Sequence, residues 1–223
     1  MHKIIELVKR RDGLDVASFQ DDWKHRHGTI AARVPGLRRY VQSHTLPQGY
    51  AKGELLFDGI AEMWFDDEPT ARAAFAGREA AASEQDAVRI IDRARRVRMR
   101  VDVHVILDGA IPADAVKNIE FVSRRPGMAL TPFRNYWREV HGPLAARIPV
   151  LLRYEQNHAQ PSAYADGAEP AYDGLAITWF RSTADMKHGT LTEEYARTRA
   201  DEANFLPDGH LPIIITREHV LIG

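Results

Sequence analysis

The chain contains one sequence pattern twice, and this internal repeat constrains the fold more than any other feature. The segment 3–44 aligns with 117–158 without a gap, and nearly half of the aligned positions are identical. After a one-residue insertion the match resumes at Asp58-Gly59 and Asp173-Gly174 and continues to His104 and His219. The repeat predicts two copies of one structural unit.

Each half predicts the same order of strands and helices. Apolar runs at 3–10 and 117–124 end in arginines and a glycine, as a strand before a turn does. In 16–33 and 130–147, Phe, Trp and His recur at i, i+4 and i+8, which indicates a helix that Pro35 and Pro149 end. Further strands are predicted from period-two alternation at 37–46, 58–65, 151–160 and 173–180, helices from Ala- and Glu-rich stretches at 67–92 and 183–206, and last strands at 97–107 and 212–222.

The order βαββαβ, present twice, is the split βαβ or ferredoxin-like unit. Its strands follow the order 4-1-3-2 with both helices on one face, and the other face requires a partner sheet. We therefore predict an α+β fold in which two ferredoxin-like repeats form one pseudo-dimeric α+β barrel. The expected boundaries are 1–107 for the first repeat, 108–116 for a linker and 117–223 for the second repeat.

Composition excludes several classes of function. The 223 residues carry a formal net charge of −1 and no cysteine, which excludes disulfides, thiolate nucleophiles and cysteine-ligated metals. The first residues lack the apolar run of a signal peptide, and no stretch reaches the roughly 20 apolar residues of a membrane span. The basic run 93–100 alternates with apolar residues from Val97 onward, which indicates a helix end entering a strand rather than a nucleic-acid site. We expect a cytoplasmic protein that binds a small molecule and neither nucleic acid nor membrane.

The repeated motifs resemble those of EthD-type members of the dimeric α/β-barrel superfamily. They comprise Trp-x-x-x-His-Gly at Trp23 and Trp137 and Gln-x-His at Gln42 and Gln156. The resemblance covers nearly the whole chain and implies the fused barrel. Related barrels include polyketide cyclases, isomerases, lyases and haem enzymes, so the resemblance identifies the fold better than the reaction.

His27 and His141 are the leading acid/base candidates. Each lies on the apolar stripe of its helix and therefore points toward the sheet. Such an imidazole can transfer protons near neutrality, or it can be a core residue hydrogen-bonded to a carbonyl. Both interpretations stay open at this point.

Polar residues on two strands are the other candidates. Tyr40, Gln42 and His44 share one strand face, as do Tyr154, Gln156 and His158. They form either a network inside the barrel or a pocket wall with donors for a carbonyl oxygen. Trp23 and Trp137 are assigned to core and pocket wall, and Glu62 is either a second general base or the partner of a basic residue.

No cofactor is predicted. No metal is predicted either, because the side chains of His25 and His27 point about 200° apart on a helix with 3.6 residues per turn. The preferred function is a lyase, isomerase or cyclase that transfers protons on an aromatic or polyketide-like carbonyl compound. The alternatives are a non-catalytic accessory or ligand-binding protein and a haem protein. Since Glu62 has no counterpart at Ile177, the main site is expected in the first half, with His27 acting together with Glu62. The fused barrel needs no second chain for closure, so a monomer is the alternative, but further association makes a homodimer the expected state.

Overall fold

The computed structural model describes residues 1–223, and its two repeats have the same element order apart from one additional 3₁₀ turn in the second. The first repeat contains β1 (His2–Val8), α1 (Val16–Asp22), η1 (Trp23–His27), α2 (Gly28–Ala31), β2 (Leu37–Thr45), η2 (Pro47–Lys52), β3 (Gly59–Phe65), α3 (Glu68–Phe75), α4 (Arg78–Ala87) and β4 (Val97–Leu107). The second contains β5 (Val116–Val122), α5 (Leu130–Tyr136), η3 (Trp137–His141), α6 (Gly142–Ala145), β6 (Leu151–Ala159), η4 (Pro161–Gly167), β7 (Gly174–Phe180), α7 (Thr183–Gly189), α8 (Glu193–Asp201), η5 (Glu202–Asn204) and β8 (Ile213–Ile222).

The strands are hydrogen-bonded in the order β1-β3-β2-β8-β5-β7-β6-β4, which is a closed barrel. Within this order each repeat contributes the predicted 4-1-3-2 arrangement, β4-β1-β3-β2 and β8-β5-β7-β6. The predicted α+β fold of two ferredoxin-like repeats is therefore confirmed.

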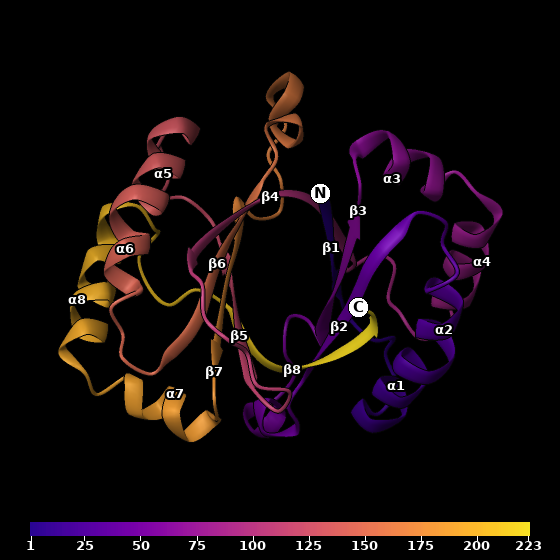
Figure 1. The fold of residues 1–223 in the computed structure, drawn as a ribbon, viewed down its shortest axis with the longest axis horizontal. Helices are drawn as coiled ribbons and strands as arrows, with labels where there is room; N and C mark the ends of the chain where they lie inside the picture. Colours follow the sequence, from indigo (N-terminus) through magenta and orange to yellow (C-terminus); the bar gives the residue numbers. More distant parts are fainter. The chain divides into compact units, whose positions relative to one another are not determined.

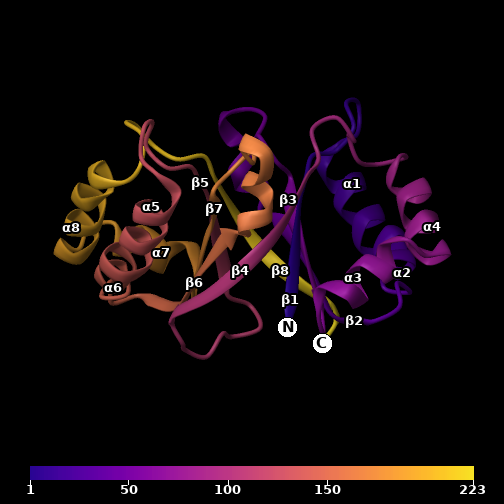
Figure 2. The same ribbon diagram turned by 90° about the horizontal axis from the view of Figure 1, so that it is seen from above.

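The chain divides into two compact units, which are described separately below. The first unit is Met1–Val101 with Thr216–Gly223, and the second is Asp102–Ile215. In the first unit the helices α1 to α4 lie on one face of β1, β3 and β2 (Figures 1 and 2). In the second unit α5 to α8 lie in the same way on β5, β7 and β6.

The core of the first unit lies between its helices and its sheet. Ile4 and Val8 of β1 pack there with Phe19 and Trp23 of the first helical segment and with Phe65 of β3. Because side chains alternate along a strand, Glu6, Tyr40, Ala61 and Met63 also face the helices, whereas Glu62 faces the other way. None of the helices is long and apolar enough to span a membrane.

Two predicted helices differ from expectation. The helix predicted at 67–92 is divided into α3 and α4, because Gly77 adopts an extended backbone with ψ 166° and begins a new helix. The helix predicted at 183–206 is likewise divided, and the side chain of Thr192 caps α8 by accepting a hydrogen bond from the Tyr195 N–H. The 3₁₀ turns after β2 and β6 were not predicted.

Candidate functional site

Each unit holds a buried tryptophan between a histidine and a glycine. The Trp23 ring stacks on His44 with centroids 4.5 Å apart, and Trp137 stacks on His158 at 4.3 Å. A Cβ atom added at Gly59 would lie 2.7 Å from the Trp23 ring and 2.3 Å from the Ser43 carbonyl oxygen. Only glycine therefore allows the ring to lie this close to the strand.

The histidines of this stack belong to a buried hydrogen-bond network. His44 Nε2 lies 3.0 Å from Gln42 Oε1, and Gln42 Nε2 donates to the Trp23 carbonyl at 2.9 Å and to the Tyr40 hydroxyl at 2.9 Å. Burial, followed by the nearby His219, lowers the pKa of His44 to about 3. The equivalent effects lower the pKa of His158 to about 2. Both imidazoles are neutral at physiological pH and hold the helix to the sheet.

The helices carry a π-helical turn where they present the candidate catalytic histidines. Trp23–His27 and Trp137–His141 are π-helical, and the Gly28 and Gly142 N–H groups donate to the carbonyls of Trp23 and Trp137. Such turns occur often at functional sites. They place His27 and His141 in the space between helix and sheet, where both side chains are buried.

Each of these histidines is hydrogen-bonded to an aspartate on the last α-helix of its repeat, α4 or α8. His27 Nδ1 lies 3.1 Å from Asp86 Oδ2, and His141 Nδ1 lies 2.9 Å from Asp201 Oδ2. Burial lowers the pKa of both histidines below 6.5 despite these carboxylates. Each neutral ring therefore donates from Nδ1 to the carboxylate and keeps an unprotonated Nε2, the arrangement of a general base with an orienting acid.

The two aspartates differ in what else they bind. Asp86 accepts from the guanidinium groups of Arg26 at 3.1 Å and Arg89 at 2.9 Å, so two cations share its charge. Asp201 accepts instead from the neutral Tyr136 hydroxyl at 2.6 Å and the Asn204 amide at 3.0 Å. More of its negative charge is available to stabilise an imidazolium, which makes His141 better suited than His27 to accept a proton.

A cavity beside the histidine is well developed only in the second unit. It measures about 170 Å³ there, against about 30 Å³ at the equivalent place in the first unit. The difference follows from aligned positions: Met63, Phe75 and Arg98 of the first unit correspond to the smaller Thr178, Thr190 and Ile213. About 150 Å³ is enough for a benzene ring, so the second-unit cavity can take a small aromatic compound.

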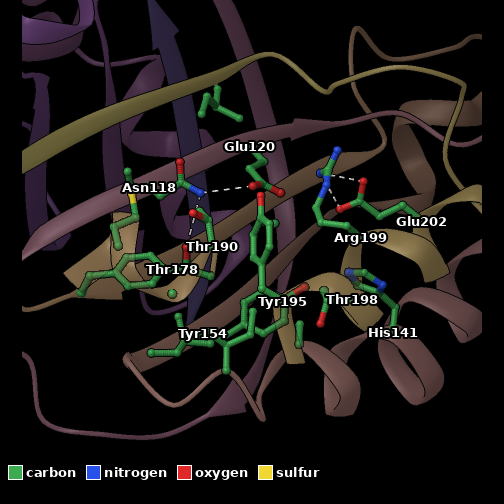
Figure 3. Close-up of a pocket in the computed structure, with 18 residues that line it drawn as sticks. Asn118, Glu120, His141, Tyr154, Thr178, Thr190, Tyr195, Thr198, Arg199 and Glu202 are labelled. Atoms are coloured by element: carbon green, nitrogen blue, oxygen red, sulfur yellow. Dashed lines mark hydrogen bonds and ion pairs between the residues drawn. The ribbon is translucent and has the colours of Figure 1, made fainter. Parts of the chain in front are cut away.

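Tyr154 lines this cavity with His141 (Figure 3). Its hydroxyl oxygen accepts hydrogen bonds from Gln156 Nε2 at 3.0 Å and Trp137 Nε1 at 3.2 Å. These donors occupy its lone pairs, which leaves the hydroxyl proton free to be donated. Burial raises the pKa of Tyr154 well above its usual range, so the proton stays on the oxygen.

Two carboxyl groups also face the cavity, Glu120 of β5 and Glu202 of η5 (Figure 3). Glu120 accepts a hydrogen bond from the Asn118 amide at 3.2 Å, and Glu202 is bound by Arg199 at 2.7 Å. Burial raises the pKa of Glu120, and it raises the pKa of Glu202 to about 7.

The predicted site residues thus separate into three groups. His27, His141, Tyr40 and Tyr154 line the cavities. Trp23, Trp137, His44 and His158 form the framework described above and line neither cavity. Glu62 forms an ion pair with Lys3 at 2.8 Å on the opposite face of the sheet. The expected pairing of His27 with Glu62 is wrong, because strand alternation directs these side chains to opposite faces.

Sequence reasoning missed the orienting aspartates and the carboxyl pair. Asp86 and Asp201 are aligned in the repeat, which is a signal that could have identified them. Glu202 could have been noticed as well, since its counterpart is Ala87. Glu120 gave no such signal, because its counterpart Glu6 is also a glutamate, although Glu6 is paired with Arg98.

The fold and these sites define a dimeric α+β-barrel protein of which both barrel halves lie in one chain. The EthD domain matches twice, at residues 11–94 and 125–208. The chain belongs to the EthD family, as the Trp-x-x-x-His-Gly motifs indicated.

Known proteins with this fold have diverged far in sequence. A search of curated proteins gives no match. Among solved structures, an anthrone oxidase-like protein is similar with a TM-score of 0.65 at 9% identity, covering 99% of this chain and 93% of that one. A chlorite dismutase from Candidatus Nitrospira defluvii has a TM-score of 0.53 at 8% identity, covering 99% and 91%. A haem-binding protein from Thermus thermophilus has a TM-score of 0.51 at 10% identity, covering 97% and 90%. These likenesses concern the fold.

Proposed function

We propose that the chain is a cofactor-independent enzyme of the lyase, isomerase or cyclase type. It acts by proton transfer on a small aromatic or polyketide-like carbonyl compound. The observation that carries the proposal is His141, which lines the second-unit cavity together with Tyr154 and is hydrogen-bonded to Asp201. The working site is therefore assigned to the second unit rather than the first.

The chemistry begins at His141 Nε2, which accepts a proton from the carbon next to the substrate carbonyl. Asp201 stabilises the imidazolium that forms, and Tyr154 donates a hydrogen bond to the enolate oxygen as the negative charge develops there. Return of the proton to a different carbon gives an isomer. Attack of the enolate carbon on a second carbonyl of the substrate gives a ring.

Hydrogen exchange tests this step without knowledge of the natural substrate. Three uncharged ketones, 2-tetralone, 2,4-dihydroxyacetophenone and 1-phenylbutane-1,3-dione, are incubated with the protein in D₂O. Loss of the protons next to the carbonyl is followed by ¹H NMR. We expect catalysed exchange with at least one ketone and a loss of about 10²–10⁴-fold in H141Q, the usual contribution of a general base.

The repeat supplies the matched control. H27Q makes the same change where the cavity measures only about 30 Å³, so it should leave exchange almost unchanged. Equal losses in H27Q and H141Q, or no exchange with any of the three ketones, would contradict the proposal. Binding of a ketone without exchange would instead favour a ligand-binding protein.

Two structural neighbours point to functions that simple measurements separate from this proposal. One neighbour is named as haem-binding, and a Soret band in the absorption spectrum of the purified protein would favour a haem protein. Another is named anthrone oxidase-like, and oxygen uptake with anthrone would favour an oxidase.

A further inference from the structure

Glu120 occupies a position that is neutralised in the first unit but not in the second. Its counterpart Glu6 forms an ion pair with Arg98 of β4, which also donates to Glu84 at 2.7 Å. In the second unit Ile213 stands in place of Arg98, and Arg199 stands in place of Glu84. Glu120 keeps only a neutral donor, the Asn118 amide at 3.2 Å.

The nearest cation is already engaged. Arg199 binds Glu202 at 2.7 Å, and its guanidinium also contacts His210 Nδ1 at 2.8 Å. The titratable and charged groups that line the cavity around Glu120 come from four elements: His141 of η3, Tyr154 of β6, Tyr195 and Arg199 of α8, and Glu202 of η5. One arginine thus faces two carboxyl groups, and one of these carboxyls is left without a balancing charge.

We infer that Glu120 keeps its proton at neutral pH and presents it to the ligand, so that the second-unit cavity takes an uncharged carbonyl or phenol compound and rejects carboxylates. A carboxylate would bring a second negative charge close to Glu202, whose arginine is already bound. An uncharged carbonyl oxygen can instead accept the hydrogen bond of a neutral carboxyl group. Burial, which raises the pKa of Glu120, acts in the same direction.

The catalytic consequence of a protonated Glu120 rests on the proposed function. When His141 removes the carbon proton, the O–H of Glu120 can transfer its proton to the carbonyl oxygen and give a neutral enol. In the return step the enol O–H proton goes back to Glu120, and the imidazolium delivers its proton to carbon. The protons balance without a further reactant.

Infrared spectroscopy in D₂O tests the protonation directly. The carbonyl-stretching band of protonated carboxyl groups should be present in the wild-type protein at pH 7 and retained in the matched variant E6Q. In E120Q the band should be weaker, and only the part contributed by Glu202, whose pKa is about 7, should remain. Circular dichroism confirms that both variants are folded. A band that is unchanged in E120Q overturns the inference.

Calorimetric titration tests the ligand class with two probes of similar shape, 2-tetralone and the carboxylate 2-naphthoate. We expect 2-tetralone to bind the wild-type protein at least tenfold more tightly. Equal or tighter binding of 2-naphthoate, or no binding of 2-tetralone, overturns the inference.

Neither measurement depends on turnover. Loss of exchange in H141Q without any effect of E120Q would refute the acid role of Glu120 alone, whereas absence of exchange in the wild-type protein would refute the proposed function alone.

Discussion

Replacement of Glu202 by glutamine should change how the stability of the protein depends on pH. Burial raises the pKa of Glu202 from 4.5 to about 7 in the folded chain. The folded state therefore binds more protons than the unfolded state between these values. It follows that the contribution of Glu202 to the free energy of unfolding falls as pH rises from about 4.5 to 7. E202Q removes this titration and keeps the shape of the side chain.

The magnitude follows from the same values. The difference between 4.5 and about 7 corresponds to about 3.4 kcal/mol, and about 2.5 kcal/mol of it falls between pH 5 and pH 8. The Glu202 side chain is 12% exposed, so solvent screening lowers the expected value to about 1–2.5 kcal/mol. We expect E202Q to gain this amount relative to the wild-type protein over that pH interval.

Urea unfolding at pH 5, 6, 7 and 8, followed by tryptophan fluorescence, measures the difference. Glu193 provides the control, because its carboxylate is 81% exposed and paired with Arg197 on the surface. E193Q should keep a constant difference from the wild-type protein across the range. If E202Q behaves like E193Q, the Glu202 carboxyl does not titrate near neutrality and the assignment of its environment is wrong.

Three further predictions test the framework and the assembly. G174A should lower the free energy of unfolding by about 1–3 kcal/mol, because the added Cβ would lie 2.8 Å from the Trp137 ring; urea unfolding measures it, and no loss would contradict the tight packing. R98I should lower the free energy of unfolding by about 1–3 kcal/mol, because Glu6 is left buried without its cation. The double variant R98I/E6Q should recover most of this loss in the same assay. Light scattering of the intact chain should give a homodimer of twice 25.2 kDa, and the mass of one chain would refute this.

The sequence was sufficient to predict the topology. The repeat, with its period-two strands and the prolines after each first helix, determines two βαββαβ units. The strand order within each unit follows from that. Tyr40, Gln42 and His44 were also placed correctly on one strand face, because alternation needs no tertiary information. Local periodicity is therefore sufficient to predict the strands and helices of each unit.

The site could be predicted only in part, because alternation does not reveal which face of a strand meets the helices. Glu62 shares a face with Ile60 and Trp64, and all three point away from the helices that carry His27. The larger cavity of the second unit was not foreseen for a different reason. Whether a cavity exists depends on the combined volumes of side chains from separate elements, such as Thr178, Thr190 and Ile213. Local sequence patterns do not predict this combined volume.

The two units share the residues that hold helix to sheet and differ in the residues around the cavity. Both keep the residues that lock helix to sheet: the stacked tryptophan and histidine, the glutamine that bridges them and the glycine beneath the ring. The differences concentrate where the first unit fills its cavity and neutralises Glu6 with Arg98, while the second leaves Glu120 and Glu202 facing open space. A half-buried carboxyl without a bound cation destabilises a fold, so the presence of Glu120 beside an open cavity in one unit alone is best explained by a ligand. The comparison of the two units within one chain therefore supports the second-unit cavity as the working site.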